Sequence, residues 1–158
     1  MTARRTSALL AAVLLGPAGC ASVVTVPAAP DAADPVCADV MLALPQDLGD
    51  MPRLRTGSQS TAAWGDPDEP VVLRCGVDPP PPTTDPCVTA DDGSIAIDWV
   101  AVAEPETGEA RTWTFTSYGR SPAVEVVVPA SVTAVRSTSF LIDLGPAVAR
   151  VEQTRTCL

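Results

Sequence analysis

Residues 111–128, with the sequence RTWTFTSYGRSPAVEVVV, contain the pattern that decides the fold. In the first half, Trp113 and Phe115 alternate with threonines, and in the second half a valine occupies every second position from Val124. This alternation places apolar side chains on one face of a β-strand. Residues 119–122, Gly-Arg-Ser-Pro, mark a turn between the two halves. The stretch therefore predicts an antiparallel hairpin with a loop of about four residues.

Two more strands are predicted upstream of this hairpin, at 71–76 and 94–102. In the second of them, one face carries four apolar residues: Ile95, Ile97, Trp99 and Ala101. Residues 78–86 include four consecutive prolines, which remove backbone donors, and are predicted to form a loop. Residues 45–69 are rich in Pro, Gly and Asp, and we expect irregular structure there with a brief pairing at 62–64.

A short helix is predicted at each end of the domain. Asp34 caps free backbone N–H groups and Pro35 suits the first helical position. Apolar residues then recur on one helical face: Cys37, Val40, Met41 and Leu44. Residues 137–152 have a helical apolar pattern that Pro146 delays or kinks. The predicted fold class is α+β, a single domain over 35–158 in which a small antiparallel β-sheet carries N- and C-terminal helices packed on one face.

The start of the chain has the organisation of an export signal. Two arginines precede an apolar run over 7–15, which is too short to cross a bilayer. Residues 16–20, Gly-Pro-Ala-Gly-Cys, then resemble a bacterial lipobox, although Pro17 stands where leucine is usual. We expect residues 1–19 to be a signal peptide and Cys20 to be lipidated with palmitate-type acyl chains. Ordinary secretory cleavage, which would give a secreted protein, is the alternative.

Residues 20–34 lack both hydrophobic periods and contain two prolines. They are predicted to be a lipid-anchored, disordered tether. The expected location is the extracytoplasmic face of the cell membrane, where the acyl chains of Cys20 hold the protein.

Cysteines give the clearest chemical signal of the remaining chain. Beyond Cys20 there are four, at 37, 75, 87 and 157, and an even count in an exported protein predicts two disulfides. The spacings do not match those of metal sites. Cys75 could pair with Cys87, or Cys37 with Cys75, and physical reasoning from the sequence leaves both pairings open.

Composition excludes several classes of function. The chain has 158 residues, no histidine, no lysine and a formal charge of −9. Histidine-based catalysis, histidine metal sites and lysine-based cofactor or phosphate sites are therefore excluded. A negative surface also disfavours nucleic acid. The acidic runs at 66–69 and 91–92 lack the ligand spacing of a calcium loop and are interpreted as solvated loops. We expect no enzyme activity, no cofactor and no metal.

Two arginines are candidate site residues. Arg74 interrupts an apolar strand, and Arg120 lies in the turn after Tyr118. A guanidinium in an acidic domain either pairs with a carboxylate or binds an anionic ligand. The internal pair is the favoured interpretation, and three residues could supply its carboxylate: Asp66, Asp98 and Glu125.

Aromatic residues are the other candidates. Trp64, Trp99, Trp113 and Tyr118 could form a binding platform, but a domain with so few aromatics needs them in its core. Trp64, in a Gly-Asp-Pro context, is the one most readily expected at the surface.

Several patches in order resemble one protein family, the actinobacterial envelope proteins grouped as domain of unknown function 3515. The patches are residues 35–37 with 44–45, 63–67, 71–77, 97–99 and 118–126. The resemblance implies an exported protein whose cysteines pair as Cys37–Cys75 and Cys87–Cys157. It implies no established activity.

The expected function is that of a non-enzymatic cell-envelope lipoprotein that binds a protein partner or a cell-wall component. The alternative is a small anionic-ligand binding or sensor domain that uses Arg74 and Arg120.

Overall fold

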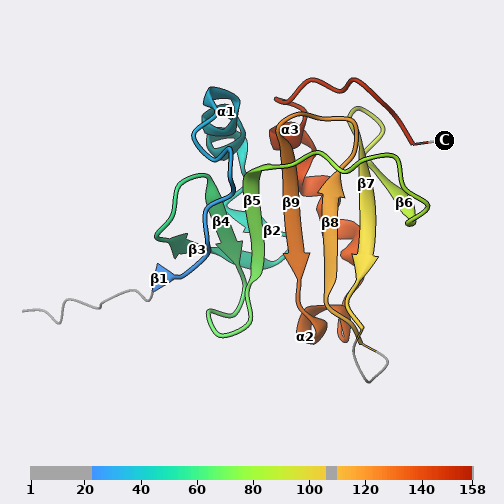
Figure 1. Cartoon of the computed structure of the whole chain (residues 1–158). Helices are drawn as coiled ribbons and strands as arrows, with labels where there is room; N and C mark the ends of the chain where they lie inside the picture. The colour runs from blue at the N-terminus through green and yellow to red at the C-terminus, as the bar shows by residue number, and fades with distance from the viewer. Residues whose placement is uncertain (1–22, 106–109, 158) are drawn as a thin grey trace, which may run out of the picture.

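The hairpin predicted over 111–128 lies within a sheet of many strands (Figure 1). The computed structural model describes residues 23–105 and 110–157. In it, β8 (Trp113–Ser117) pairs antiparallel with β9 (Ala123–Val128), with Phe115 opposite Val126. The hairpin prediction is confirmed.

Nine strands are present in the described part of the chain, in the order β1-β3-β4-β5-β9-β8-β7-β6, with β2 paired to β3. All neighbours are antiparallel except β1 and β3. The other strands are β1 (Val23–Val24), β2 (Asp47–Leu48), β3 (Met51–Thr56), β4 (Thr61–Trp64), β5 (Val71–Val77), β6 (Cys87–Asp91) and β7 (Ala96–Ala103).

The sheet is larger than the small one expected. Residues 78–86 form the predicted loop and 62–64 do pair, but β3 and β6 were not predicted. Pro52 argues against β3 as a central strand, yet β3 lies near the sheet edge, where a missing donor is tolerated. In β6, four of the five residues are exposed and none is buried, so the sequence has no two-residue hydrophobic period there.

The helices are few and short. The N-terminal helix is confirmed as α1 (Pro35–Ala43), where the Asp34 carboxylate accepts a hydrogen bond of 2.9 Å from the Val36 N–H. The predicted C-terminal helix is divided into η1 (Thr138–Leu144), a 3₁₀ helix, and α3 (Gly145–Val148). Pro146 lies in the first turn of α3, where its missing N–H costs nothing. A further turn, α2 (Ala130–Thr133), follows β9. In residues 23–105 and 110–157, no helix combines the length and the apolarity needed to cross a membrane.

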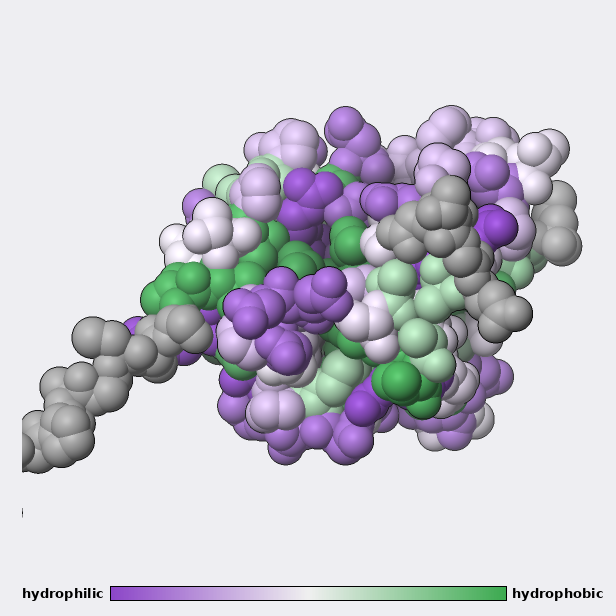
Figure 2. All heavy atoms as spheres, turned by 90° about the horizontal axis from the view of Figure 1, so that it is seen from below, coloured by the Kyte–Doolittle hydropathy of each residue, from purple (hydrophilic) through white to green (hydrophobic). Residues whose placement is uncertain are grey.

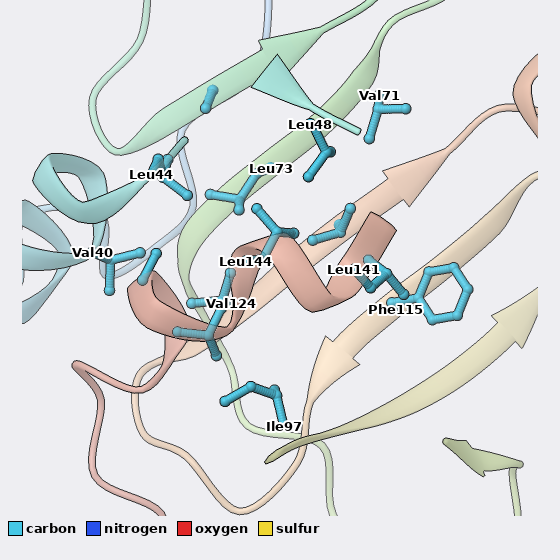
Figure 3. Close-up of a cluster of buried hydrophobic side chains, with 14 of the residues drawn as sticks. Val40, Leu44, Leu48, Val71, Leu73, Ile97, Phe115, Val124, Leu141 and Leu144 are labelled. Carbon is cyan, nitrogen blue, oxygen red and sulfur yellow. The ribbon is translucent and has the colours of Figure 1, made fainter. Parts of the chain in front are cut away.

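The main core forms on the sheet face that carries the alternating apolar residues. Leu73, Phe115 and Val124 belong to the same buried cluster as residues from α1, η1 and α3. Figure 3 shows Leu141 and Leu144, from η1, among these sheet side chains. Burial of each large aliphatic side chain contributes on the order of 1.5–3 kcal/mol, so this cluster is the main source of stability.

The N-terminal segment (residues 23–34) is part of the domain. Its apolar residues Val26, Ala29 and Ala32 are buried, and the two alanines pack with Val77 and Ala123. The prediction of a disordered tether over 20–34 is therefore wrong for residues 23–34, because small apolar side chains at every third position fit against the sheet end. The predicted signal peptide and lipidated Cys20 lie outside the described residues.

The N-terminal segment is held by close backbone contact as well. Asp31 donates its N–H to the carbonyl of Gly76 at 2.9 Å. Gly76 has a φ of 101°, and a Cβ there would overlap the Asp31 backbone, so only glycine allows this approach. Seen from below, hydrophobic residues gather beside the start of the described chain, around β1 (Figure 2); Val23 is exposed there.

Both expected disulfides are present. Cys37 in α1 bonds Cys75 in β5, with the Cα atoms 5.6 Å apart and both residues fully buried. Cys87 at the start of β6 bonds Cys157, with a Cα separation of 6.2 Å, and Cys87 is exposed. This is the pairing that the family resemblance implied. One bridge lies in the core and the other at the surface.

Candidate functional site

A buried carboxylate organises the end of the sheet where β7 begins. Asp98, only 7% exposed, accepts hydrogen bonds from the Thr89 hydroxyl at 2.7 Å and from the Gln153 side-chain amide at 3.2 Å. It also accepts one from the Cys157 N–H at 3.0 Å. Three donors compensate for the lost hydration of the carboxylate. They fix residues 149–157, named here the C-terminal segment, against β6 and β7.

Arg120 fixes the same segment from the β8–β9 turn. It is 5% exposed, and its guanidinium donates to the Val151 carbonyl and, at 3.2 Å, to the Gln153 side-chain oxygen. Burial lowers the pKa of Arg120, and the negative charge of Asp98 partly opposes this shift. Its Nε has no partner among the described residues and is not solvent-accessible. Arg120 therefore braces the chain rather than presenting a free cation.

Gly119 makes close contact with the C-terminal segment possible. Its φ is 70°, its carbonyl accepts the Thr154 N–H at 2.7 Å, and a Cβ at this position would overlap the Arg155 backbone. Glycine alone allows these two segments of the chain to approach so closely.

Arg74 forms the internal pair that the sequence favoured. Its Nε and one terminal nitrogen donate to a single Glu125 oxygen at 2.9 and 2.6 Å. The two residues are directly opposite on β5 and β9. The side chains are 30% and 16% exposed, so the pair sits at the open face of the sheet. Its carboxylate partner already satisfies this guanidinium, and Arg74 does not line the clefts described below.

A cleft of about 610 Å³ lies beside Tyr118. One wall is the proline-rich loop at Pro82–Asp85, and the other is the C-terminal segment at Arg155–Cys157. Val100 and Tyr118 also line the cleft. A second hollow, of about 400 Å³, adjoins it, because Pro82, Tyr118 and Arg155 line both. In Figure 1 the loop after β5 crosses the sheet end toward β6, near the red C-terminal segment.

The six candidate residues do not assemble into one site. Tyr118 lines both hollows, Arg120 lines the second, and Asp98 lies buried behind them. Trp64 is fully buried in the core and donates its indole N–H to the Pro45 carbonyl at 3.3 Å. The core position favoured for the aromatics is therefore confirmed for Trp64, although it was the one most readily expected at the surface. Asp66 is exposed and lines a separate hollow with Asp68 and Glu69.

Sequence reasoning missed Arg155 and the polar wall opposite it. That wall carries Thr83, Thr84 and Asp85, and the Thr83 hydroxyl donates to the Asp85 carboxylate at 2.7 Å. A usable signal existed. Asp85 precedes Cys87 by two residues, and Arg155 precedes Cys157 by two, so the Cys87–Cys157 bridge brings both side chains to one place.

The cleft lining combines an aromatic ring with polar and charged groups. The cleft offers a phenol ring, threonine hydroxyls, one carboxylate and one guanidinium, which can recognise a ligand that is both polar and apolar. Arg155 is exposed and forms no ion pair with a described residue. Among residues 23–105 and 110–157, no group of three or more His, Cys, Asp or Glu side chains is placed to hold a metal ion.

Comparison with known proteins identifies the family. No curated protein and no solved structure matches the chain. A family model described as "Protein of unknown function (DUF3515)" matches residues 6–157, which is nearly the entire sequence. The chain therefore belongs to the DUF3515 family of proteins of unknown function.

Proposed function

We propose that this protein is a non-enzymatic lipoprotein of the cell envelope, anchored at Cys20, that binds a cell-wall component in the cleft beside Tyr118. The export-type N-terminus and its lipobox-like end support the location. The two disulfides support it too, since such bonds persist in oxidising compartments outside the cytoplasm.

The separation between the buried sheet face and the cleft at the strand ends supports a binding role. In our proposal, the helices at both ends of the chain pack on one face of the sheet, because α1, η1 and α3 contribute to one buried cluster. That face serves stability. The strand ends near the proline-rich loop are then left to bind a ligand, where Pro82–Asp85 and Arg155 are exposed.

The single observation that carries the proposal is the cleft lining. Tyr118 offers an aromatic face, the loop threonines offer hydroxyl groups, and Arg155 offers a cation that no described acid neutralises. Sugars stack on aromatic rings and hydrogen-bond to hydroxyls, while Arg pairs with carboxylates. A cell-wall fragment that carries both sugar and carboxylate groups fits this set.

Titration with soluble peptidoglycan fragments, followed by NMR of the folded domain, tests the site. We expect shifts confined to residues around Tyr118 and Arg155. Tyr118→Leu and Arg155→Gln should each weaken binding about tenfold, whereas Tyr118→Phe, which keeps the ring, should weaken it less. Arg111→Gln removes another exposed arginine and is the matched control. Equal loss in the control, or no shift at the cleft, would contradict the proposal.

Metabolic labelling with a fatty-acid analogue tests the anchor separately. The full-length protein should label and stay with the membrane fraction, and Cys20→Ala should do neither. A Cys20→Ala protein that labels and fractionates like the native protein would exclude the lipid.

The alternative, an anion sensor built on Arg74 and Arg120, receives less support. Glu125 occupies Arg74, and backbone and Gln153 oxygens occupy the buried Arg120. The two arginines do not meet at either hollow beside Tyr118.

A further inference from the structure

The two edges of the sheet are finished differently. At one edge the chain adds its own N-terminal segment, with β1 running parallel to β3. At the other edge, β6 pairs with β7 alone, and no described strand lies on its outer side (Figure 1). An unpaired edge presents backbone donors and acceptors to any extended chain.

The register shows which backbone groups of β6 point outward. The Ala101 N–H donates to the Pro86 carbonyl, so residue 86 bonds toward β7. Bonding alternates along an antiparallel pair, and positions 88 and 90 therefore also bond toward β7. The N–H and C=O groups of Cys87, Thr89 and Asp91 are left facing outward. Three such residues are enough to bond a five-residue strand.

Negative charge surrounds this edge. Asp85, Asp91 and Asp92 are exposed at its two ends, and none forms an ion pair with a described residue. Exposed acids are more numerous at the Asp91 end, which carries two, than at the Asp85 end, which carries one. At the Asp91 end, Asp92 lines a further hollow with two more acids, Asp47 and Asp143.

These charges decide which strand fits. If two copies paired antiparallel through β6, Asp85 of one copy would approach Asp91 and Asp92 of the other, which like-charge repulsion opposes. A basic strand is attracted instead. Val88 is 42% exposed and offers an apolar contact to one face of the added strand.

We propose that β6 is a docking edge for an extended, basic segment of a partner protein, which adds to the sheet as a further strand with its cationic residues beside Asp91 and Asp92. Main-chain hydrogen bonds to residues 87, 89 and 91 give affinity, and the acidic end sets the direction. This docking edge is separate from the cleft beside Tyr118 and does not depend on its ligand.

Hydrogen exchange by NMR tests the proposal with two synthetic peptides, Arg-Arg-Thr-Val-Thr-Val-Thr and its Glu-Glu counterpart. The arginine peptide should slow exchange of the Thr89 and Asp91 amides about tenfold or more, and the glutamate peptide should not. Thr89→Pro removes the central outward N–H and should abolish the effect. Thr89→Val loses the same hydroxyl bond to Asp98 but keeps the N–H, and should still bind.

A second variant keeps the test decisive where Thr89→Pro fails to fold. Asp91→Asn with Asp92→Asn removes two charges while the amide oxygens still accept the turn hydrogen bonds from residues 93–95. It should remove the preference for the arginine peptide. Equal protection by both peptides, equal binding by the two Thr89 variants, or dimerisation through β6 in sedimentation would each overturn the proposal.

Discussion

The N-terminal and C-terminal segments are attached to the domain by the same device but with opposite chemistry. Each crosses the sheet end against a glycine with positive φ, Gly76 for the first and Gly119 for the second. The N-terminal segment buries apolar side chains, whereas residues 154–156 of the C-terminal segment are exposed and held by polar bonds. The glycines allow each segment to lie close to the sheet. Whether the segment then joins the core or forms a wall of the cleft depends on whether its side chains are apolar or polar.

The two disulfides follow this division. Cys37–Cys75 stabilises the core beside the N-terminal segment, and Cys87–Cys157 ties the C-terminal segment to the edge strand β6. Apolar burial is cooperative with the entire fold, while a polar wall can be loosened locally. The comparison predicts that damage on the N-terminal side unfolds the protein and damage on the C-terminal side changes only the cleft.

The largest effect should come from the buried bridge. Replacing Cys37 and Cys75 together with alanine should lower the free energy of unfolding by about 3–5 kcal/mol, since both the cross-link and buried core atoms are lost. The matched control replaces Cys87 and Cys157. The Cys87–Cys157 bridge closes the longer loop, and loop-closure entropy alone would make it only about 0.5 kcal/mol more stabilising than Cys37–Cys75. Its Cys87 is exposed and contributes no buried packing. Urea unfolding of both variants measures the two losses. A larger loss of unfolding free energy on removing Cys87–Cys157 would contradict the assignment of the core to the N-terminal side.

Exchanging the two glycines for alanine sharpens the comparison. Gly76→Ala should cost about 2–3 kcal/mol, because the new Cβ meets the backbone of Asp31 and of the buried Ala32, and the residue cannot relax its φ. Gly119→Ala has the same steric conflict but should displace the exposed C-terminal segment at smaller cost. Thermal unfolding measures the first effect, and faster hydrogen exchange at Thr154 reports the second. Equal losses of stability would show that both segments belong to one cooperative core.

Asp98→Asn should separate the polar wall from the core. The amide cannot accept all three donated hydrogen bonds, so about 1–3 kcal/mol of local stability should be lost. Reductant should then reduce Cys87–Cys157 faster, while Cys37–Cys75 stays protected. Mass spectrometry of alkylated peptides checks this, with Asp66→Asn, an exposed acid elsewhere, as the control. Unchanged reduction would mean that Asp98 does not hold the segment.

Acid should produce the smallest effect. Hydrogen bonds from Arg136 lower the pKa of Asp50, and backbone N–H groups of Ile95 and Ser94 lower that of Asp92. A lowered folded-state pKa contributes stability above the unfolded pKa, near 4, that is lost as pH falls through the folded value. Stability should therefore decline slightly below about pH 4. Asp50→Asn and Asp92→Asn should each reduce this decline. An unchanged dependence of stability on pH would show that these carboxylates do not cause it.

The sequence predicted the parts of the fold that have a clear period. The β8–β9 hairpin, β7 and α1 follow from alternation or capping. The prediction failed where a segment becomes ordered only by packing against a distant part of the same chain. The apolar side chains of residues 23–34 are all small, and the burial of Ala29 and Ala32 depends on a distant surface formed by Val77 and Ala123.

The candidate site was predictable only in part. Tyr118 was chosen as one of four candidate aromatics and Arg120 as a cation in an acidic domain, and both line a hollow. Arg155 could be placed near Asp85 only through the Cys87–Cys157 pairing, because no local pattern joins residues 70 positions apart.

The edge position of β1 bears on how an anchored molecule would stand on a membrane. With Cys20 acylated as proposed, the three peptide units from residue 20 to residue 23 reach no further than roughly 11 Å. The sheet margin that carries Val23 would then rest near the lipid headgroups, and β6, at the far end of the strand order, would face outward into the envelope. An incoming protein would meet the acidic margin before it met the bilayer.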